Sequence, residues 1–431
     1  MAFDKAAYVE LLRKLISVNK DLQNNPPLNI PKEDLASAHV FAALEPYTVA
    51  KGGPLLLRRE TFVEGRGNVI IEYPCGDKNA PYVSFVGSHL DVVPANPDEW
   101  DFNPYELSVD GDMLRGRGVT DCLGHVALVT ELFRALGKNK PALKVNVAAV
   151  LIANEENSSE QGIGVDELVR RGMMAHLKSG PVFWVDSADK QPCLGTAGMV
   201  AWQLKAKGKL FHSGLPHQAI NPLEMLMEAL AVIQKRFYEE FPAHPEEERY
   251  RFVTCSSLKP TQWSYPGGGI NQIPGEATLC GDIRVTPFYS AEKVAARVKQ
   301  YVEDINADVT KLPSRGPVSK YALDDGVKGS LEFTVMGEVV SGIACNIDSA
   351  GNKVLCEATE EVLGECKPYS LTGSLPLVKE LQDAGFDIQI CGYGLMKTYH
   401  AKNEYGLLSD FESGFKIMST IIDKMNKNTK A

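Results

Sequence analysis

Three short segments in the first half of the chain are almost entirely apolar. They comprise residues 83–87, 145–153 and 182–185. Runs of this length with little polar alternation are typical of strands that are covered on both faces, as in parallel sheets. We therefore predict three buried strands at these positions and a fourth at residues 388–393, where the pattern is similar.

Other segments carry apolar residues at helical spacing. The clearest lie within residues 1–19 and within residues 123–136, where apolar positions recur every three or four residues. Strands and helices that alternate in this way predict an α/β domain, with a central, mostly parallel sheet flanked by helices.

The pattern changes near Gly195, where shorter strand-like and helical segments begin to alternate. The predicted strands are residues 199–207, 251–258 and 277–286, and the predicted helices are residues 222–238 and 291–306. This change predicts a smaller α+β module, residues 195–340, inserted into a catalytic domain that consists of residues 1–194 and 341–431.

Composition narrows the possible partners. The chain has 431 residues, 44% of them hydrophobic, which is enough for two domains with sizeable cores. Its net charge of -10 and its lack of long basic runs argue against nucleic acid and anionic membranes as partners. No segment approaches the ~18 consecutive apolar residues of a membrane-spanning helix. A small-molecule substrate fits this balance best.

Cysteine usage and the first residues indicate the compartment. The nine cysteines are odd in number, scattered and without a Cys-x-x-Cys pair, as in reduced cytosolic proteins. The N-terminal segment lacks the charged-then-apolar pattern of a secretory signal. We therefore expect a cytoplasmic protein.

His89 and Asp91 come directly after the first predicted strand. Residues i and i+2 of a strand project to the same face, so the Asp91 carboxylate can hold the His89 imidazole in one tautomer. Metal-binding histidines commonly have such a partner. An ordinary hydrogen-bonded pair at a strand end is the alternative interpretation.

Asp121 follows Gly116-Arg117-Gly118 and precedes the predicted helix at residues 123–136. A carboxylate at this place is a candidate metal ligand. It can equally be an N-cap or first-turn residue, because the helix N-terminus favours negative charge.

The doublet Glu155 and Glu156 follows the second predicted strand. In open α/β sheets, ligand sites gather at the carboxyl ends of strands. Two adjacent carboxylates there can divide the work, since one can bind a cation while the other accepts a proton from water. A solvated acidic turn is the alternative.

Two further candidate ligands follow the remaining predicted strands. Asp186 comes directly after residues 182–185, and His400 lies beyond residues 388–393. Taken alone, a single histidine such as His400 is more often a partly buried structural imidazole.

These motifs together resemble a family of co-catalytic zinc enzymes that includes aminoacylase, acetylornithine deacetylase and succinyl-diaminopimelate desuccinylase. The strings that carry the resemblance are GSHLDVVP at residues 87–94, GRG at 116–118 with Asp121, Glu155–Glu156, and HSG at 212–214. Their order and spacing extend over nearly the whole chain.

The resemblance implies a site with two metal ions, zinc or cobalt. One ion would be held by His89 and Asp186, and the other by Glu156 and His400, with Asp121 bridging the two. Glu155 would be the general base for a water molecule, and Asp91 would orient His89. Such a site hydrolyses an amide without a covalent nucleophile.

The resemblance also implies roles for the inserted module, which in this family is a ferredoxin-like lid that forms a homodimer. His212 would stabilise the oxyanion in the partner's site, while Asn271 and Arg284 would hold the substrate. Thr372, Gly373 and Ser374 resemble the loop that binds the substrate carboxylate. Alternatively, His212 caps a turn and Arg284 pairs with a nearby acid such as Asp282.

Within the family, the resemblance extends furthest to the eukaryotic acetylornithine deacetylases. It is carried by VDSAD at residues 185–189, HSGLPH at 212–217 and YHAKNEY at 399–405. This implies an N-acyl amino acid substrate, N2-acetyl-L-ornithine, and a step of arginine biosynthesis.

Two alternatives to the deacetylase remain. One is a dipeptidase or aminoacylase of the same family. Asp186 favours the dipeptidase, because deacylases of the family often carry Glu at this position and the aminopeptidase branch often carries Asp. A catalytically silent binding protein is the other alternative. The intact Glu155 argues against it, because a silent protein has no chemical need for a base beside its ligands.

Overall fold

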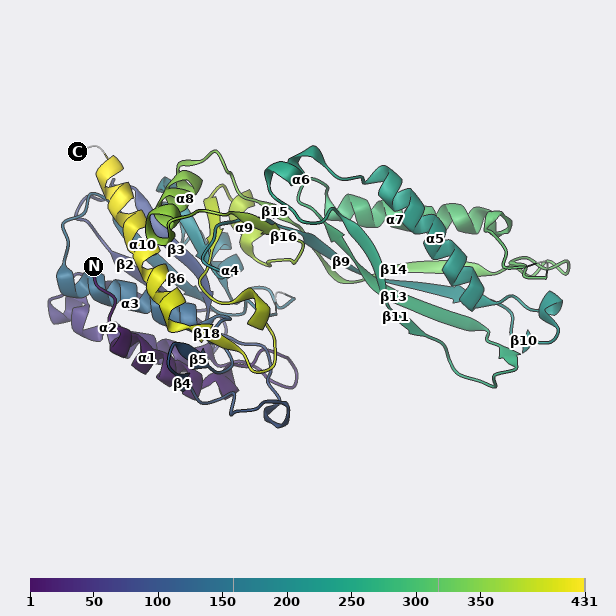
Figure 1. Ribbon diagram of the computed structural model, residues 1–431, viewed down its shortest axis with the longest axis horizontal. Coiled ribbons are helices and arrows are strands. Elements are labelled where there is room, and N and C mark those ends of the chain that lie inside the picture. The colour runs from purple at the N-terminus through teal and green to yellow at the C-terminus, as the bar shows by residue number, and fades with distance from the viewer. Residues whose placement is uncertain (158, 317, 430–431) are drawn as a thin grey trace. The chain divides into compact units, whose positions relative to one another are not determined.

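The computed structural model describes residues 1–157, 159–316 and 318–429, and it divides into two compact units (Figure 1). The first unit comprises Met1–Leu194, Cys345–Tyr369 and the chain from Pro376 onward. The second unit comprises Gly195–Ala344 and Ser370–Leu375.

A twisted sheet forms the centre of the first unit. Six consecutive strands of this nine-stranded sheet are, in spatial order, β1 (Leu56–Thr61), β2 (Gly67–Tyr73), β6 (Asn146–Ile152), β3 (Tyr82–His89), β7 (Pro181–Val185) and β17 (Asp387–Cys391). The four strands from β6 to β17 are parallel, whereas β1 and β2 pair antiparallel. The sheet is therefore mixed, and its parallel part brings the carboxyl ends of β6, β3 and β7 to one edge.

The apolar runs of the sequence form the middle of this sheet. Every residue of β6 and β7 is buried, as expected for strands covered on both faces. Phe85 of β3 stacks on Phe183 of β7, with ring centroids 5.7 Å apart. Such a pair contributes about 0.5–1.5 kcal/mol beyond its buried area.

Helices of the first unit pack against this sheet and against one another. The long helices are α1 (Lys5–Ser17), α2 (Glu33–Leu44), α3 (Leu123–Asn139), α8 (Ala350–Leu363) and α10 (Leu408–Asn428); α4 (Val165–Arg170) and α9 (Val378–Asp383) are short. Helix α3 contacts β2 and β3, and α1, α2 and α10 contact α3. Among the described residues, none of the helices has the length and apolar character needed to cross a bilayer.

Local signals explain where these helices begin. The Asp4 side chain accepts the backbone N–H of Ala7 at 3.1 Å and so caps α1. Ser349 likewise accepts the N–H of Asn352 at 3.1 Å at the start of α8.

The mixed sheet, with its parallel middle strands, and the helices that pack against it confirm, for this unit, the α/β class predicted from the sequence.

The second unit is built around an antiparallel sheet with the order β11–β13–β9–β14. The strands are β9 (Gly198–Lys207), β11 (Ser257–Ser264), β13 (Glu276–Val285) and β14 (Ser330–Val340). Helices α5 (Pro222–Glu240) and α7 (Ala291–Ala307) pack on it, and β9 alternates between buried and half-buried residues. The chain order β9-α5-β11-β13-α7-β14 is that of a ferredoxin-like α+β fold.

One predicted strand of this unit is wrong. Residues 251–256 do not belong to a strand, because Arg251 has a φ of 59° and the N–H of Phe252 bonds to the carbonyl of Glu247 at 2.9 Å. These residues close the C-terminus of the short helix α6 (Pro245–Arg249), and β11 begins only at Ser257. The apolar content of the segment gives no sign of this helix end.

Candidate metal centre

The site begins with His89, the last residue of β3, which has no exposed surface. The strand bends just before it, because Gly87 has a φ of 99° and a Cβ there would lie 2.4 Å from the Trp184 ring. This conformation favours glycine over any other residue. The bend directs the His89 imidazole to the carboxyl edge of the sheet, beside the ends of β6 and β7.

Asp121 lies between two histidines that are distant in sequence. One of its oxygens is 2.9 Å from Nε2 of His89, and the other is 3.1 Å from Nε2 of His400. The Asp121 carboxylate is thus bidentate between two imidazoles. Its alternative interpretation as an N-cap is wrong, because Cys122 occupies the N-cap position of α3.

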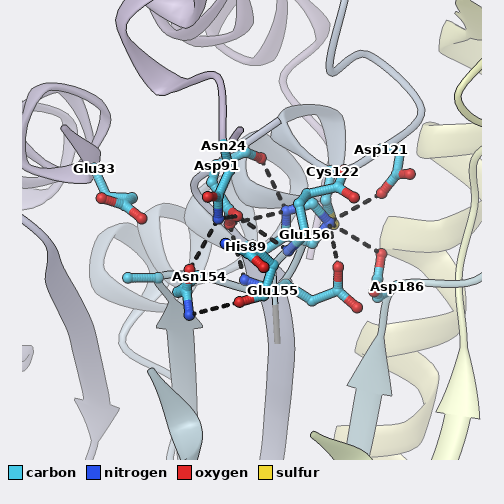
Figure 2. A network of polar contacts seen from close by, with 12 residues as sticks. Asn24, Glu33, His89, Asp91, Asp121, Cys122, Asn154, Glu155, Glu156 and Asp186 are labelled. Carbon is cyan, nitrogen blue, oxygen red and sulfur yellow. Dashed lines mark hydrogen bonds and ion pairs between the residues drawn. The ribbon is translucent and has the colours of Figure 1, made fainter. Parts of the chain in front are cut away.

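The remaining candidate ligands divide between these two histidines. Asp186 Oδ1 lies 3.6 Å from Nε2 of His89, and Glu156 Oε2 lies 3.2 Å from Nε2 of His400. Glu155 Oε2 is 3.9 Å from His89 Nε2. The five side chains His89, Asp121, Glu156, Asp186 and His400 therefore face a common centre, which Figure 2 shows for four of them.

The carboxylates of this centre are buried, which changes their protonation. Burial, together with the charge of Asp186, raises the pKa of Glu155 well above its usual value. Burial is also the largest cause that raises the pKa of Asp186 to about 8. The interpretation of Glu155 and Glu156 as a solvated acidic turn is therefore wrong, since Glu155 is only 6% exposed.

The histidines partly offset this concentration of negative charge. Hydrogen bonds to Asp121 and Glu156 raise the pKa of His400 to about 10. Although burial acts against ionisation, hydrogen bonds from His400 and His89 keep the pKa of Asp121 below its usual value. Two imidazoles nevertheless face four carboxylates, so the centre as a whole favours cations.

The donor set fits divalent metal ions. In the described ranges of the chain, two groups of side chains have ligand atoms within 4.8 Å of one another, namely His89 with Asp121 and Glu156, and His89 with Cys122 and Asp186. Within the described residues, Oε1 of Glu156 and Oδ1 of Asp186 are buried and lack a hydrogen-bond partner. Buried carboxylate oxygens are rarely left without a hydrogen-bond partner, so these two oxygens are candidate metal ligands.

Asp91 lies differently from the sequence prediction. Strand β3 ends at His89, and Nδ1 of His89 bonds to the main-chain carbonyl of Asp91 at 2.9 Å, with the Asp91 carboxylate at 3.4 Å. The carboxylate instead accepts the backbone N–H groups of Glu155 and Glu156 at 3.2 and 3.1 Å. Asp91 therefore contacts both the histidine and the acidic doublet.

The sequence did not predict the polar residues that hydrogen-bond to Asp91 and to its neighbour Asn154 (Figure 2). Asn24 donates to Oδ2 of Asp91 at 2.8 Å and to Oδ1 of Asn154 at 2.9 Å. Arg66 also donates to Asn154, at 3.0 Å, and forms a buried ion pair with Glu33 at 2.8 Å. Asn154 has a φ of 62°, a conformation in which asparagine is enriched, and its position next to Glu155 was the one available signal.

The other predicted site residues belong to the second unit. His212 is exposed on strand β10 (Phe211–His212), where the N–H of Gly214 donates to its Nδ1 at 3.0 Å. The carbonyl of Asn271 accepts the N–H of Ser213 at 2.9 Å, and β10 pairs with β12 (Gln272–Ile273), so Asn271 lies just before the strand that pairs with His212. His212 thus makes the turn contact that was considered as its alternative role, and its part in catalysis stays a prediction.

Arg284 and the 372–374 loop also have local partners within this unit. Nε of Arg284 donates to Asp282 at 2.7 Å, which is the alternative considered for this residue. The Thr372 hydroxyl bonds to that of Thr254 at 3.3 Å, and the carbonyl of Gly373 accepts the N–H of Ala197 at 2.9 Å. Ser374 is half-buried on the same loop. Substrate binding by these residues stays a prediction.

Comparison with known proteins identifies the class. The chain matches the model of peptidase family M20/M25/M40 over residues 85–424, and it belongs to this family. The family predicted from the sequence is thus confirmed. Membership also makes the chain a hydrolase of amide C–N bonds.

Two relatives match over the full chain. One is acetylornithine deacetylase of Arabidopsis thaliana, which is 57% identical to this chain over 428 residues, or 99% of this chain and 97% of the relative. The other is 51% identical over 437 residues to acetylornithine deacetylase of Dictyostelium discoideum, covering 99% and 98%.

Solved structures share the fold at low sequence identity. The di-peptidase Dug1p of Saccharomyces cerevisiae superposes with a TM-score of 0.71 at 17% identity, covering 99% of this chain and 97% of that one. The YXEP protein of Bacillus subtilis, described as a dinuclear metal binding peptidase of the M20 family, gives a TM-score of 0.62 at 14% identity and covers 99% and 100%. These likenesses establish the fold.

Proposed function

We propose that the chain is a metal-dependent amidohydrolase that removes the acetyl group from N2-acetyl-L-ornithine and releases L-ornithine and acetate, a step of arginine biosynthesis. The observation that carries the chemistry is the Asp121 carboxylate, whose two oxygens face His89 and His400 at 2.9 and 3.1 Å. The two full-length relatives named acetylornithine deacetylase support the choice of substrate.

Two divalent ions, zinc or cobalt, are the proposed cofactors. His89 and Asp186 would hold one ion, Glu156 and His400 would hold the other, and Asp121 would contact both. Ions bound in this way polarise the scissile carbonyl and lower the pKa of water from 15.7 to about 7. Among the described residues, Oε1 of Glu156 and Oδ1 of Asp186 are buried without a hydrogen-bond partner, which supports this assignment.

Glu155 is the proposed general base. Its buried carboxylate lies 3.9 Å from Nε2 of His89 and is not needed as a ligand in this scheme. Burial, together with the charge of Asp186, raises its pKa well above the usual value, and a carboxylate with a raised pKa is a stronger base. Glu155 would accept a proton from the attacking water and then return it to the amine when the C–N bond breaks.

The second unit is proposed to act as a lid and dimerisation domain. In this scheme His212 donates to the oxyanion in the site of the partner subunit, where charge develops in the transition state. Asn271 and Arg284 would contact the substrate, and Thr372, Gly373 and Ser374 would bind its carboxylate. The nine scattered cysteines support a cytoplasmic protein, and the acidic net charge supports a small-molecule substrate. The homodimer rests on the family resemblance alone.

Metal analysis and a substrate panel test this proposal together. We expect elemental analysis to find two zinc or cobalt ions per chain. We also expect kcat/KM for N2-acetyl-L-ornithine to exceed that for other N-acyl amino acids and for dipeptides. A chain that binds no metal, or that leaves all these amides intact when zinc or cobalt is supplied, would contradict it.

A dipeptidase of the same family is the second candidate. Asp186 favours it, because the aminopeptidase branch often carries Asp at this position. The same panel separates the two activities, since a dipeptidase would hydrolyse dipeptides with the higher kcat/KM under identical metal loading.

A further inference from the structure

Glu404 is a buried carboxylate that the scheme above does not use. It has no exposed surface and lies four residues after the candidate ligand His400. Its side chain does not face the metal centre. Instead it enters the loop that carries Asp121, which is 283 residues away in the sequence.

The Glu404 carboxylate accepts four hydrogen bonds from this loop. Oε1 accepts the N–H groups of Thr120 and Asp121 at 2.7 and 3.1 Å. Oε2 accepts the N–H of Gly118 at 3.0 Å and Nη1 of Arg117 at 2.7 Å. Three backbone amides that converge on one anion form an anion-binding nest, and here a side chain of the same protein fills it.

Further contacts hold the two segments together. Strand β18 (Tyr405–Leu407) pairs antiparallel with β5 (Met113–Arg115), and the N–H of Gly116 donates to the carbonyl of Glu404 at 3.1 Å. The hydroxyl of Thr120 donates to the carbonyl of Tyr405 at 2.9 Å. The segment that follows His400 therefore fixes the segment that ends at Asp121.

Arg117 compensates the buried charge of Glu404. The guanidinium is 3% exposed and lies over the Trp100 ring at 5.0 Å, so its orientation is restricted. Its Nη2 also faces the carbonyls of Pro94 and Ala401 at 3.5 and 3.4 Å. A buried carboxylate that accepts hydrogen bonds from one guanidinium and three amides has its hydrogen-bonding capacity well used, which holds it in one orientation.

We propose that Glu404 is a positioning residue of the metal centre, which acts through the backbone of Thr120 and Asp121 to aim the bridging carboxylate. A carboxylate that serves two ions must present both oxygens at once, and sites of this kind tolerate errors of only about 0.5 Å. Because Glu404 holds the amide of Asp121 itself, a change at Glu404 moves the bridge relative to both histidines. This inference rests on the proposed metal-dependent function.

The test compares Glu404→Gln and Glu404→Asp with the wild-type chain. Glutamine replaces one carboxylate oxygen, which accepts hydrogen bonds, by an NH2 group, which cannot accept them from the N–H groups of the nest. Aspartate keeps the charge beside Arg117 but is one methylene too short to reach all the amides. Glu131→Gln is the matched control, because Glu131 is 2% exposed and pairs with Arg134 at 2.6 Å without contacting the metal centre.

The measurements are Co2+ titration of the full-length, metal-free proteins, the visible spectrum of the Co2+-loaded forms, and steady-state kinetics. We expect both Glu404 variants to bind Co2+ about 10–100-fold more weakly, as for other residues that orient metal ligands, and to show an altered spectrum. We expect kcat to fall with KM unchanged. Glu131→Gln should keep the wild-type affinity and spectrum even if it unfolds at a lower temperature.

The outcomes separate this inference from the function on which it rests. If wild-type protein binds two Co2+ ions and hydrolyses acetylornithine while both Glu404 variants match its affinity and spectrum, the positioning role is refuted and the function stands. If neither variant folds, Glu404 serves the fold and the positioning role is again refuted. If wild-type protein binds no metal, the proposed function itself fails.

Discussion

The carboxylate of Asp91 accepts the backbone N–H of Glu155 at 3.2 Å, so the residue that contacts the candidate ligand His89 also fixes the candidate base. A charge-assisted hydrogen bond of this kind is stronger and more directional than a neutral one. It restricts the main chain at Glu155 without occupying its side chain. The Glu155 carboxylate thus stays available for proton transfer although its backbone is held.

Replacement of Glu155 by alanine tests this division of roles. We expect Glu155→Ala to lower kcat by about 10²–10⁴, the usual contribution of a general base, while the protein retains its bound metal. The measurement is kcat for acetylornithine hydrolysis together with elemental analysis of the same sample. Unchanged turnover would remove Glu155 from the mechanism, and loss of metal would make it a ligand instead.

Removal of divalent ions should affect stability as well as activity. Without a cation, the buried carboxylates of Glu155, Glu156 and Asp186 remain close together, and Oε1 of Glu156 and Oδ1 of Asp186 have no hydrogen-bond partner in the part of the chain that the structure describes. Ions that bind only the folded chain stabilise it by about 2.7 kcal/mol at 100 times Kd. We expect a chelator to lower Tm and abolish turnover, and zinc or cobalt to restore both. A Tm that does not respond to chelation would argue against ions at this centre.

The sequence predicts the parts of the site that follow regular strands. The apolar run of β6 ends at Ile152, and Glu155 and Glu156 come shortly after it, so the position of the doublet at the sheet edge could be foreseen. The same logic locates His89 and Asp186 at the ends of β3 and β7. Strand ends are visible in a sequence because burial on both faces requires continuous apolar residues.

The supporting residues could not be predicted in this way. Asn24 contacts Asp91 across 67 positions of sequence, and Arg66 contacts Asn154 across 88. Both lie outside the periodic segments, and isolated polar residues in a sequence do not reveal their partners. Their burial depends on the tertiary structure alone.

The buried ion pair of Glu33 and Arg66 gives a stability prediction. The two side chains are 0% and 2% exposed, and Glu33→Ala would leave the guanidinium buried without its main partner. Breaking such a pair costs about 3–5 kcal/mol. Glu10→Ala is the control, because Glu10 forms an exposed i,i+4 pair with Lys14, worth about 0.3–0.5 kcal/mol. Chemical denaturation checks both, and equal losses would mean that burial adds nothing to the Glu33 pair.

His125 should make the stability of the metal-free chain depend on pH. Its Nε2 accepts the N–H of Tyr393 at 2.8 Å, so protonation of this nitrogen breaks a buried hydrogen bond. Burial is the main cause that lowers the pKa of His125 from 6.5 to about 4; the charge of His89 adds to this and that of Asp121 opposes it. Cys122, whose Sγ lies 3.5 Å from Nδ1 of His125, is a neutral neighbour because burial raises the pKa of its thiol.

The sign of this effect follows from proton binding. Between pH 6.5 and about 4 the unfolded chain binds a proton that folded His125 does not, so its contribution is complete above pH 6.5 and is lost as the pH falls towards 4. The contribution is about 3 kcal/mol. In His125→Gln, whose amide oxygen can still accept from Tyr393, unfolding free energy should fall less over this interval. Parallel curves for wild type and variant would contradict the assignment.

His212 provides the sharpest test of the proposed homodimer. Its side chain is exposed and accepts the N–H of Gly214 within a local turn, so His212→Ala should leave Tm unchanged. If His212 stabilises the oxyanion, kcat should fall by about 10²–10³. His217→Ala, five residues along the same exposed segment, is the control and should keep wild-type kinetics.

Mixing variants shows in which subunit His212 acts. A dimer of one Glu155→Ala chain and one His212→Ala chain contains a single site with both Glu155 and a His212 donated by the partner. In a two-fold symmetric dimer, random exchange of the two inactive variants should therefore restore about a quarter of wild-type activity. If His212 acts within its own chain, each site in the mixed dimer lacks one group and no activity returns.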